Sequence, residues 1–152
     1  MILSQALASP EGEVRLNLNG AGERRTFAGA FLADQFGAGV QHIAFLTDDI
    51  FETSEHLAEA GFQRLKMPDN YYDDLAVSFA LDVDLTRRLR AGHILYDRDG
   101  NTEYFQIYSA PIFRGFFFEV VQRKGGYQGY GARNAPIRLA AQMRDTKERQ
   151  QR

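Results

Sequence analysis

The sequence predicts an α+β protein with one βαβββ module preceded by an N-terminal strand and helix. Three observations support this class. Short segments in which apolar and polar residues alternate, as in half-buried strands, recur along the chain. A segment with helical spacing follows the first strand of the module. An Asp-Gly turn joins two later strands as a hairpin.

Residues 1–36 are expected to hold the N-terminal strand and helix. VRLNLN, residues 14–19, alternates strictly and follows a turn-forming segment, so it is expected to be a strand. Residues 26–36 place apolar side chains at helical spacing, with Thr26 as the N-cap and glycines directly after the helix.

The module is expected over residues 37–142. Its first strand covers residues 40–46, and a helix over 49–61 begins at the cap Asp49 and ends at Gly61. Further strands are expected at 62–67, 93–97, 102–109 and 115–123, with short helices between 68 and 92 and another from 135. Residues 143–152 are expected to be a charged tail that frays.

Composition narrows the function classes. The 152 residues suggest a single domain, and the net charge of -2 gives no electrostatic footprint for nucleic acid. Because the chain has no cysteine, any metal must be held by His, Asp or Glu, whose nitrogen and oxygen atoms suit iron, manganese, zinc or magnesium. No apolar run is long enough to cross a bilayer and the N-terminus lacks a basic start, so we expect a cytoplasmic protein without membrane partners.

Two polar residues interrupt the first strand of the module. Gln41 and His42 are adjacent, so their side chains point to opposite faces and at least one faces a packed interior. His42 is either a buried histidine with a hydrogen-bond partner or a metal ligand.

Glu119 lies in FFFEVVQ, an otherwise apolar strand. It either faces solvent or is buried, and burial requires a cation, a proton or a metal. If the first and last strands of the module share a sheet, His42 and Glu119 can converge as two thirds of a 2-His-1-carboxylate site.

The remaining polar residues have a structural and a functional interpretation each. Gln106 is either a surface residue or part of the polar interior, while Gln122 is expected on the face opposite Glu119. His56 is expected in solvent, and His93 is either a strand-edge surface residue or a third ligand. The glycine-rich loop 125–131 is interpreted as a lid or a tight chain reversal, because it lacks the context of a nucleotide loop.

Several separated motifs resemble one family. GVQHIAFLTDDIFET, PDNYYDDL, ILYDRDGNTEYFQIYS and FFFEVVQRKGGYQGYGARN occur in the order found in the C-terminal half of 4-hydroxyphenylpyruvate dioxygenase, a member of the vicinal oxygen chelate superfamily. SQALASPEGEVRLNLN also matches, so the resemblance extends to about Gln142. GYQGYGARNAPIRLAAQ is even more similar to the dioxygenase-like C-terminal region of bacterial 3-dehydroshikimate dehydratases.

The resemblance implies a site. The family binds Fe(II) through two histidines and one glutamate. By resemblance, His42 is one of the two histidines and Glu119 is the glutamate. Fe(II) is therefore the implied metal, with Mn, Mg or Zn as alternatives. The implied substrate-binding residues are Ser4, Asn19, Gln41, Gln106, Tyr130 and Asn134.

Three departures from the family pattern qualify what the resemblance implies. The other metal histidine of the family lies in a preceding module, upstream of this sequence. Two phenylalanines that clamp the aromatic ring in the family are replaced by Tyr130 and Ala135. Arg133 replaces a small residue, and the segment 109–119 is shortened. Whether the chain is itself catalytic therefore stays open.

Two functions follow from these expectations. The first is a dioxygenase-like metal protein that acts on a 2-oxo acid or related small acid; a weaker variant is a Zn or Mn site for lyase or hydrolytic chemistry. The second is a non-catalytic module of a dehydratase that serves dimerisation or small-ligand binding. The expected partner is a second copy of the chain, which would supply the second module of a two-module site, or an upstream module of a longer parent protein.

Overall fold

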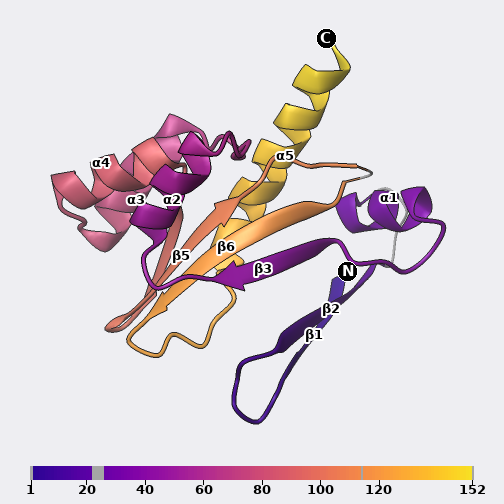
Figure 1. The fold of residues 1–152 in the computed structure, drawn as a ribbon, viewed down its shortest axis with the longest axis horizontal. Coiled ribbons are helices and arrows are strands. Elements are labelled where there is room, and N and C mark those ends of the chain that lie inside the picture. The colour runs from indigo at the N-terminus through magenta and orange to yellow at the C-terminus, as the bar shows by residue number, and fades with distance from the viewer. Residues whose placement is uncertain (1, 22–25, 114, 152) are drawn as a thin grey trace. The chain divides into compact units, whose positions relative to one another are not determined.

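The computed structural model describes residues 2–21, 26–113 and 115–151, and the chain divides after Gln41 into two compact units (Figure 1). The first unit contains strands β1 (Ile2–Ala8) and β2 (Arg15–Ala21) and helix α1 (Phe27–Asp34). The two strands pair antiparallel, with Ser4 opposite Asn19. The predicted strand and helix are confirmed, and Thr26 caps α1 by accepting a hydrogen bond from the Gly29 amide at 3.1 Å.

Strand β1 was not predicted. Its sequence ILSQALA has little β-branched character and includes two alanines with low strand propensity. The strand forms because β2 lies antiparallel beside it through its full length, a tertiary contact that local patterning does not reveal.

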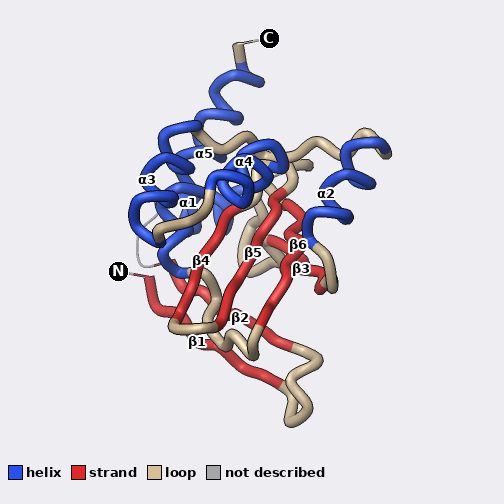
Figure 2. Tube along the Cα trace, turned by 90° about the vertical axis from the view of Figure 1, so that its left-hand side faces the viewer, coloured by secondary structure: helices blue, strands red, loops and turns tan. Residues whose placement is uncertain are grey.

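The second unit has a four-stranded mixed sheet in the order β3-β6-β5-β4 (Figure 2). Strand β3 pairs parallel with β6, and the other neighbours pair antiparallel. The chain order is one strand, then helices, then three strands, which confirms the predicted βαβββ module. The elements are β3 (His42–Leu46), α2 (Ile50–Glu59), α3 (Asp69–Phe79), α4 (Val83–Gly92), β4 (Leu95–Asp99), β5 (Thr102–Tyr108), β6 (Phe117–Lys124), the short 3-10 helix Ala132–Asn134 and α5 (Ala135–Gln150).

Helix α2 begins and ends as the sequence predicts. The Asp49 carboxylate accepts hydrogen bonds from the amides of Phe51 and Glu52 at 2.9 and 3.1 Å, which satisfies two free N–H groups of the first turn. Gly61, with φ of +76°, takes the left-handed conformation that ends the helix. The segment from Thr47 to Asp49 connects the end of β3 to the start of α2.

Three sequence expectations are corrected by the structure. The predicted strand at 62–67 is only an isolated bridge between Arg64 and Ser109, because β4 already pairs with β5 up to Gln106 and leaves only the end of that strand free on this side. His93 does not open β4; it is the C-cap of α4, with φ of +53°. The expected fraying tail continues as helix through Gln150, since i,i+4 contacts such as Arg149 with Asp145 stabilise it.

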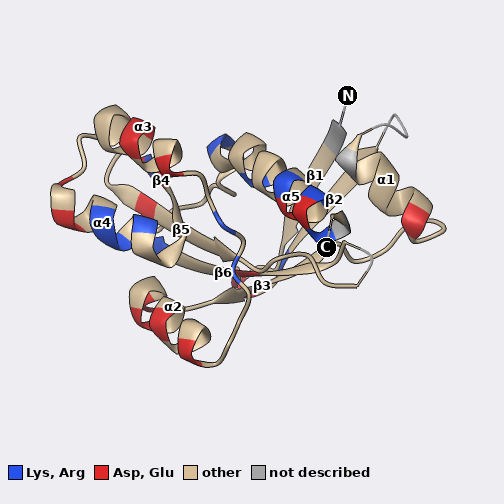
Figure 3. Cartoon of the chain, turned by 90° about the horizontal axis from the view of Figure 1, so that it is seen from above, with Lys and Arg blue, Asp and Glu red and all other residues tan. Residues whose placement is uncertain are grey.

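The two faces of the sheet differ in chemistry. Pairing places Ala44 beside Glu119 and Tyr108 on its other side, so these three side chains share one face. The opposite face carries Phe105, which packs edge-on against Phe51 of α2. Helices α2 and α5 lie on opposite sides of the sheet (Figure 3). Among the described residues, no helix is both long and apolar enough to span a membrane.

Candidate metal centre

His42 and Glu119 come together on the face of the sheet that α5 covers. His42 Nε2 lies 3.6 Å from Glu119 Oε2, and the two side chains are 27% and 7% exposed. The imidazole ring of His42 stacks on Phe117, with ring centroids 4.9 Å apart and planes 6° from parallel. The parallel pairing of β3 with β6 creates this juxtaposition, because it sets His42 opposite Phe117 and Glu119 two residues further along.

A chain of hydrogen bonds holds the other carboxylate oxygen of Glu119. The backbone N–H of Tyr96 donates to the Tyr71 hydroxyl at 2.9 Å, and that hydroxyl donates to Asn134 Oδ1 at 3.0 Å. Asn134 Nδ2 donates to Gln106 Oε1 at 2.9 Å, and Gln106 Nε2 donates to Glu119 Oε1 at 2.9 Å. The carboxylate acceptor sets the direction of the two amide bonds, and the Tyr71 hydroxyl has the Tyr96 carbonyl as a second, more distant acceptor at 3.3 Å.

The direction of this chain determines which oxygen of Glu119 is available. Gln106 must present its NH₂ group to the carboxylate, since its carbonyl already accepts from Asn134. The second N–H of Gln106 donates to the Tyr108 hydroxyl at 2.7 Å. Oε1 of Glu119 is therefore occupied, while Oε2 faces His42.

The electrostatics keep the imidazole neutral. Burial lowers the pKa of His42, the negative charge of Glu119 opposes that shift, and the positive charge of Arg138 adds to it. Burial, followed by the charge of Glu119, raises the pKa of Tyr108 well above its ordinary value. A neutral imidazole beside a carboxylate oxygen is a pair of donors that can bind a divalent cation.

The glycine-rich loop 125–131 contacts the sheet through Arg123 and Gln106. Arg123 Nη1 donates to the carbonyls of Tyr127 and Gly129 at 3.1 and 2.6 Å. A Cβ on Gly131, whose φ is +61°, would lie 2.4 Å from Gln106 Oε1, so only glycine allows this close approach.

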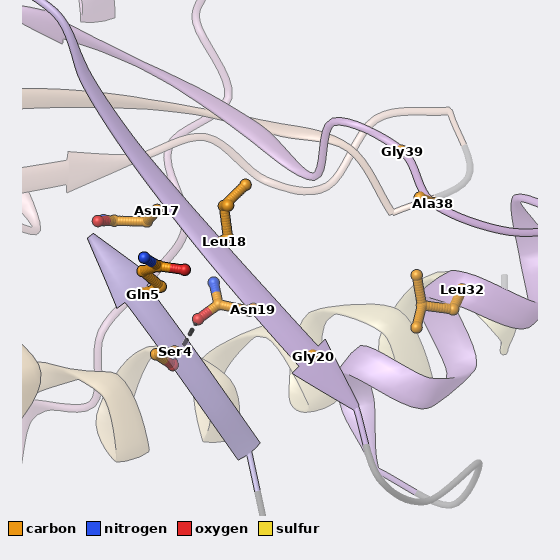
Figure 4. Close-up of a pocket in the computed structure, with 9 residues that line it drawn as sticks. All are labelled: Ser4, Gln5, Asn17, Leu18, Asn19, Gly20, Leu32, Ala38 and Gly39. Carbon is orange, nitrogen blue, oxygen red and sulfur yellow. Dashed lines mark hydrogen bonds between the residues drawn. The ribbon is translucent and has the colours of Figure 1, made fainter. Parts of the chain in front are cut away.

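The predicted substrate-binding residues divide between the two units. In the first unit, Ser4 Oγ donates to Asn19 Oδ1 at 2.7 Å, and both line a pocket of about 480 Å³ between β1, β2 and the end of α1 (Figure 4). Gln41 is half-buried directly before β3. In the second unit, Gln106 and Asn134 are buried and bonded to each other, and Tyr130 is 37% exposed with Arg123 Cζ 5.6 Å from its ring.

The other polar candidates lie away from His42 and Glu119. His56 is exposed on α2, as predicted, and His93 caps α4. Gln122 faces the α2 side of the sheet, where its Oε1 accepts from the Ile50 amide, which confirms its predicted orientation opposite Glu119. Within the described ranges, no group of three His, Cys, Asp or Glu side chains could enclose a cation.

Sequence reasoning missed three residues of this site. Tyr71 and Arg138 lie on helices α3 and α5, far along the chain from Glu119, and Tyr108 reads as an ordinary aromatic strand residue. A usable signal existed only for Tyr108, which is two residues from Gln106 and therefore shares its face of the strand.

Comparison with known proteins identifies a matching family and similar proteins. The chain matches the Glyoxalase/Bleomycin resistance protein/Dioxygenase superfamily over residues 4–103, more than half of its length. It is 45% identical over 142 residues to 3-dehydroshikimate dehydratase of Pseudomonas aeruginosa, and 34% identical over 147 residues to 4-hydroxyphenylpyruvate dioxygenase of Legionella pneumophila. These alignments include 93% and 95% of this chain but only 22% and 42% of the two relatives.

Solved structures show the same fold. A xylose isomerase-like TIM barrel/4-hydroxyphenylpyruvate dioxygenase fusion protein superposes with a TM-score of 0.80 at 45% identity, covering 92% of this chain and 23% of that one. A mutant of 4-hydroxymandelate synthase from Streptomyces coelicolor superposes with a TM-score of 0.81 at 32% identity, covering 95% and 42%. The resemblance inferred from the sequence is thus confirmed, and the chain spans less than half the length of each of these proteins.

Proposed function

Because this chain belongs to the Glyoxalase/Bleomycin resistance protein/Dioxygenase superfamily, we propose that it supplies part of a divalent-metal centre in which His42 and Glu119 are two ligands. The observation that carries the proposal is the 3.6 Å separation of His42 Nε2 and Glu119 Oε2 on one face of adjacent strands. Two donors that bind one cation at about 2.1 Å and at right angles lie roughly 3 Å apart, so a small side-chain adjustment suffices.

The donor pair suits non-haem iron and related divalent metals. One imidazole and one carboxylate are part of the 2-His-1-carboxylate arrangement of non-haem Fe(II) oxygenases. Fe(II) is our first candidate, with Mn, Mg or Zn as alternatives. When bound, such a metal supplies Lewis-acid polarisation of a chelated acid and, as iron, redox capacity.

The chain's own residues position the ligands. Gln106 holds Oε1 of Glu119 and leaves Oε2 for the metal, while Asn134 and Tyr71 fix the orientation of the Gln106 amide. Partners of this kind determine how strongly a ligand binds its metal. A loss of Gln106 should therefore weaken metal affinity about 10- to 100-fold.

We propose a 2-oxo acid or related small acid as the substrate. Ser4, Asn19 and Gln41 remain our proposed contacts from the first unit, supported by the shared pocket of Ser4 and Asn19. Gln106 and Asn134 are bonded to each other, so a substrate reaches them by replacing one of these hydrogen bonds. Tyr130 is the proposed contact from the glycine-rich loop.

A third protein ligand should come from another module. The short share of each relative that this chain spans supports an upstream module of a longer parent protein, and pairing of two copies is the alternative. Strand β3 supports pairing of either kind, since it is an edge strand whose Ile43, Phe45 and Leu46 are 45%, 53% and 68% exposed.

Metal titration tests the proposal. Isothermal titration with Mn²⁺ should give saturable binding to the wild type and a loss of at least tenfold in affinity for His42→Ala. His56→Ala, which removes an exposed histidine from α2, is the matched control and should bind like the wild type. Equal Mn²⁺ affinity in wild type and His42→Ala would contradict the proposed centre.

A second function is favoured because the proposed metal centre has two protein ligands in this chain rather than three. Among the described residues, no group of three His, Cys, Asp or Glu side chains accompanies His42 and Glu119, so the second proposal is a non-catalytic module of a dehydratase that serves dimerisation or small-ligand binding. The fusion of a TIM barrel to a dioxygenase-like part in a solved relative supports this alternative. It predicts no Mn²⁺ binding, together with a dimer or a ligand-bound monomer by mass measurement.

A further inference from the structure

Arg138 brings a positive charge to the face of the sheet that holds His42 and Glu119. It lies in the first turn of α5, and its Cζ is 5.5 Å from the Tyr108 ring and 5.3 Å from the Phe117 ring. Both rings belong to this face, and the Phe117 ring also stacks on His42. The Phe117 ring therefore contacts both the His42 imidazole and the Arg138 guanidinium.

Among the residues that the structure describes, the guanidinium has only a neutral hydrogen-bond partner. Its Nη1 donates to Gln142 Oε1, one turn further along α5, at 2.7 Å. Among the ion pairs of the described residues, none includes Arg138. The carboxylate of Glu119 is engaged by Gln106 and His42.

A half-buried guanidinium with no anionic partner among the described residues is an unusual arrangement. Removing a cation from water is costly unless a negative charge compensates, and the planar fork of arginine matches a carboxylate through two parallel hydrogen bonds. The two aromatic rings shield this guanidinium from part of the solvent, which strengthens any ion pair it forms. The site therefore favours an incoming carboxylate.

The position of Arg138 sets the length of a ligand that also reaches the metal ligands. The His42 ring centroid lies 4.9 Å and Arg138 Cζ lies 5.3 Å from the centroid of the Phe117 ring. The two groups are therefore at most roughly 10 Å apart, a span that a five-carbon dicarboxylic acid bridges once a hydrogen bond is added at each end.

We propose that Arg138 is a specificity-determining residue that binds a second carboxylate of the substrate, so that the site prefers a 2-oxo dicarboxylic acid over a 2-oxo monocarboxylic acid. This inference rests on the proposed function, because the first carboxylate and the oxo group are assigned to a metal held by His42 and Glu119. An arginine against two aromatic rings distinguishes such a ligand by charge rather than by shape.

Calorimetry with two ligands of equal carbon number tests the preference. The Mn²⁺-loaded protein is titrated with 2-oxoglutarate and with 2-oxopentanoate, which lacks the second carboxylate. We expect the wild type to bind 2-oxoglutarate at least tenfold more tightly. Arg138→Gln should lose that preference while keeping its affinity for Mn²⁺ and for 2-oxopentanoate, and Arg138→Lys should retain part of it.

Arg144→Gln is the matched control, because it removes the same charge from an exposed position of α5 and should leave the preference unchanged. Equal binding of the two acids by the wild type, or a preference that persists in Arg138→Gln, would overturn the inference. Far-ultraviolet circular dichroism confirms that each variant is folded before it is titrated.

A separate titration distinguishes failure of the metal centre from failure of this inference. If Mn²⁺ does not bind, the proposed function fails, and the metal-free protein is titrated with glutarate. Binding that Arg138→Gln abolishes and Arg144→Gln preserves would still support Arg138 as a carboxylate site. No glutarate binding would refute it together with the metal centre.

Discussion

Two adjacent tyrosines on α3 should respond in opposite ways to loss of their hydroxyl groups. The Tyr71 hydroxyl accepts from the Tyr96 amide and donates to Asn134 Oδ1. The Tyr72 hydroxyl is fully buried, and the described part of the chain offers it no hydrogen-bond partner. Both side chains are tyrosines on the same helix and both are almost completely buried, but they differ in their hydrogen bonds.

The magnitudes follow from the groups that each substitution leaves unpaired. Tyr71→Phe orphans a buried N–H and a buried amide oxygen, each worth about 1–2 kcal/mol, so we expect a loss of about 2–4 kcal/mol in the free energy of unfolding. Tyr72→Phe orphans nothing and removes a buried unsatisfied hydroxyl, so we expect no loss and a gain of up to about 1 kcal/mol.

Urea unfolding followed by circular dichroism at 222 nm measures both changes, since the chain has no tryptophan to report by fluorescence. With a denaturant dependence of about 2 kcal/mol per M, the midpoint of Tyr71→Phe should fall by about 1–2 M. Equal midpoints for the two variants, or a larger loss in Tyr72→Phe, would refute the hydrogen-bond chain described above.

Three further outcomes are expected. Gly131→Ala should lower the thermal midpoint more than Gly126→Ala, because both strain a positive φ but only Gly131 directs a Cβ at Gln106; equal losses would exclude that close approach. Burial and then nearby positive charges lower the pKa of His93, so its contribution to stability is present above pH 6.5 and is lost as the pH falls below that value. His93→Asn suits the left-handed C-cap and removes the titrating group. Urea midpoints of this variant should therefore change less than those of the wild type between pH 7.5 and 5. Burial, followed by a hydrogen bond to a carboxylate, raises the pKa of Tyr127 to about 12, so the contribution of its protonated hydroxyl to stability is lost as the pH rises from 10 to 12. Tyr127→Phe should therefore lose less stability than the wild type over that interval.

The parts of the fold that local chemistry determines were predictable. Thr26 and Asp49 are side-chain caps that can be recognised from the residues that follow them, and both caps are present. Gly61 likewise ends α2 because its backbone adopts a conformation that other residues avoid. The convergence of His42 and Glu119 was predictable only on the condition that the first and last strands are neighbours, which the structure satisfies.

The parts that depend on distant segments were not predictable. Strand β1 exists through its pairing with β2, and the segment predicted as a strand at 62–67 pairs only with the end of β5 that β4 leaves free. The bond between Tyr71 and Asn134 joins residues 63 positions apart. The position of the Arg138 charge depends on how α5 packs on the sheet. A helix sequence alone does not predict which strand residues its side chains contact.

The parallel pairing of β3 with β6 has a consequence for how the protein is made. β4 and β5 can pair as soon as their short hairpin leaves the ribosome, whereas β3 must wait until almost the whole second unit has been synthesised. His42 and Glu119 therefore meet at a late stage of folding, and the unfolded chain offers a cation no preformed pair. Any cation bound between them would favour the completed sheet by mass action and delay its opening.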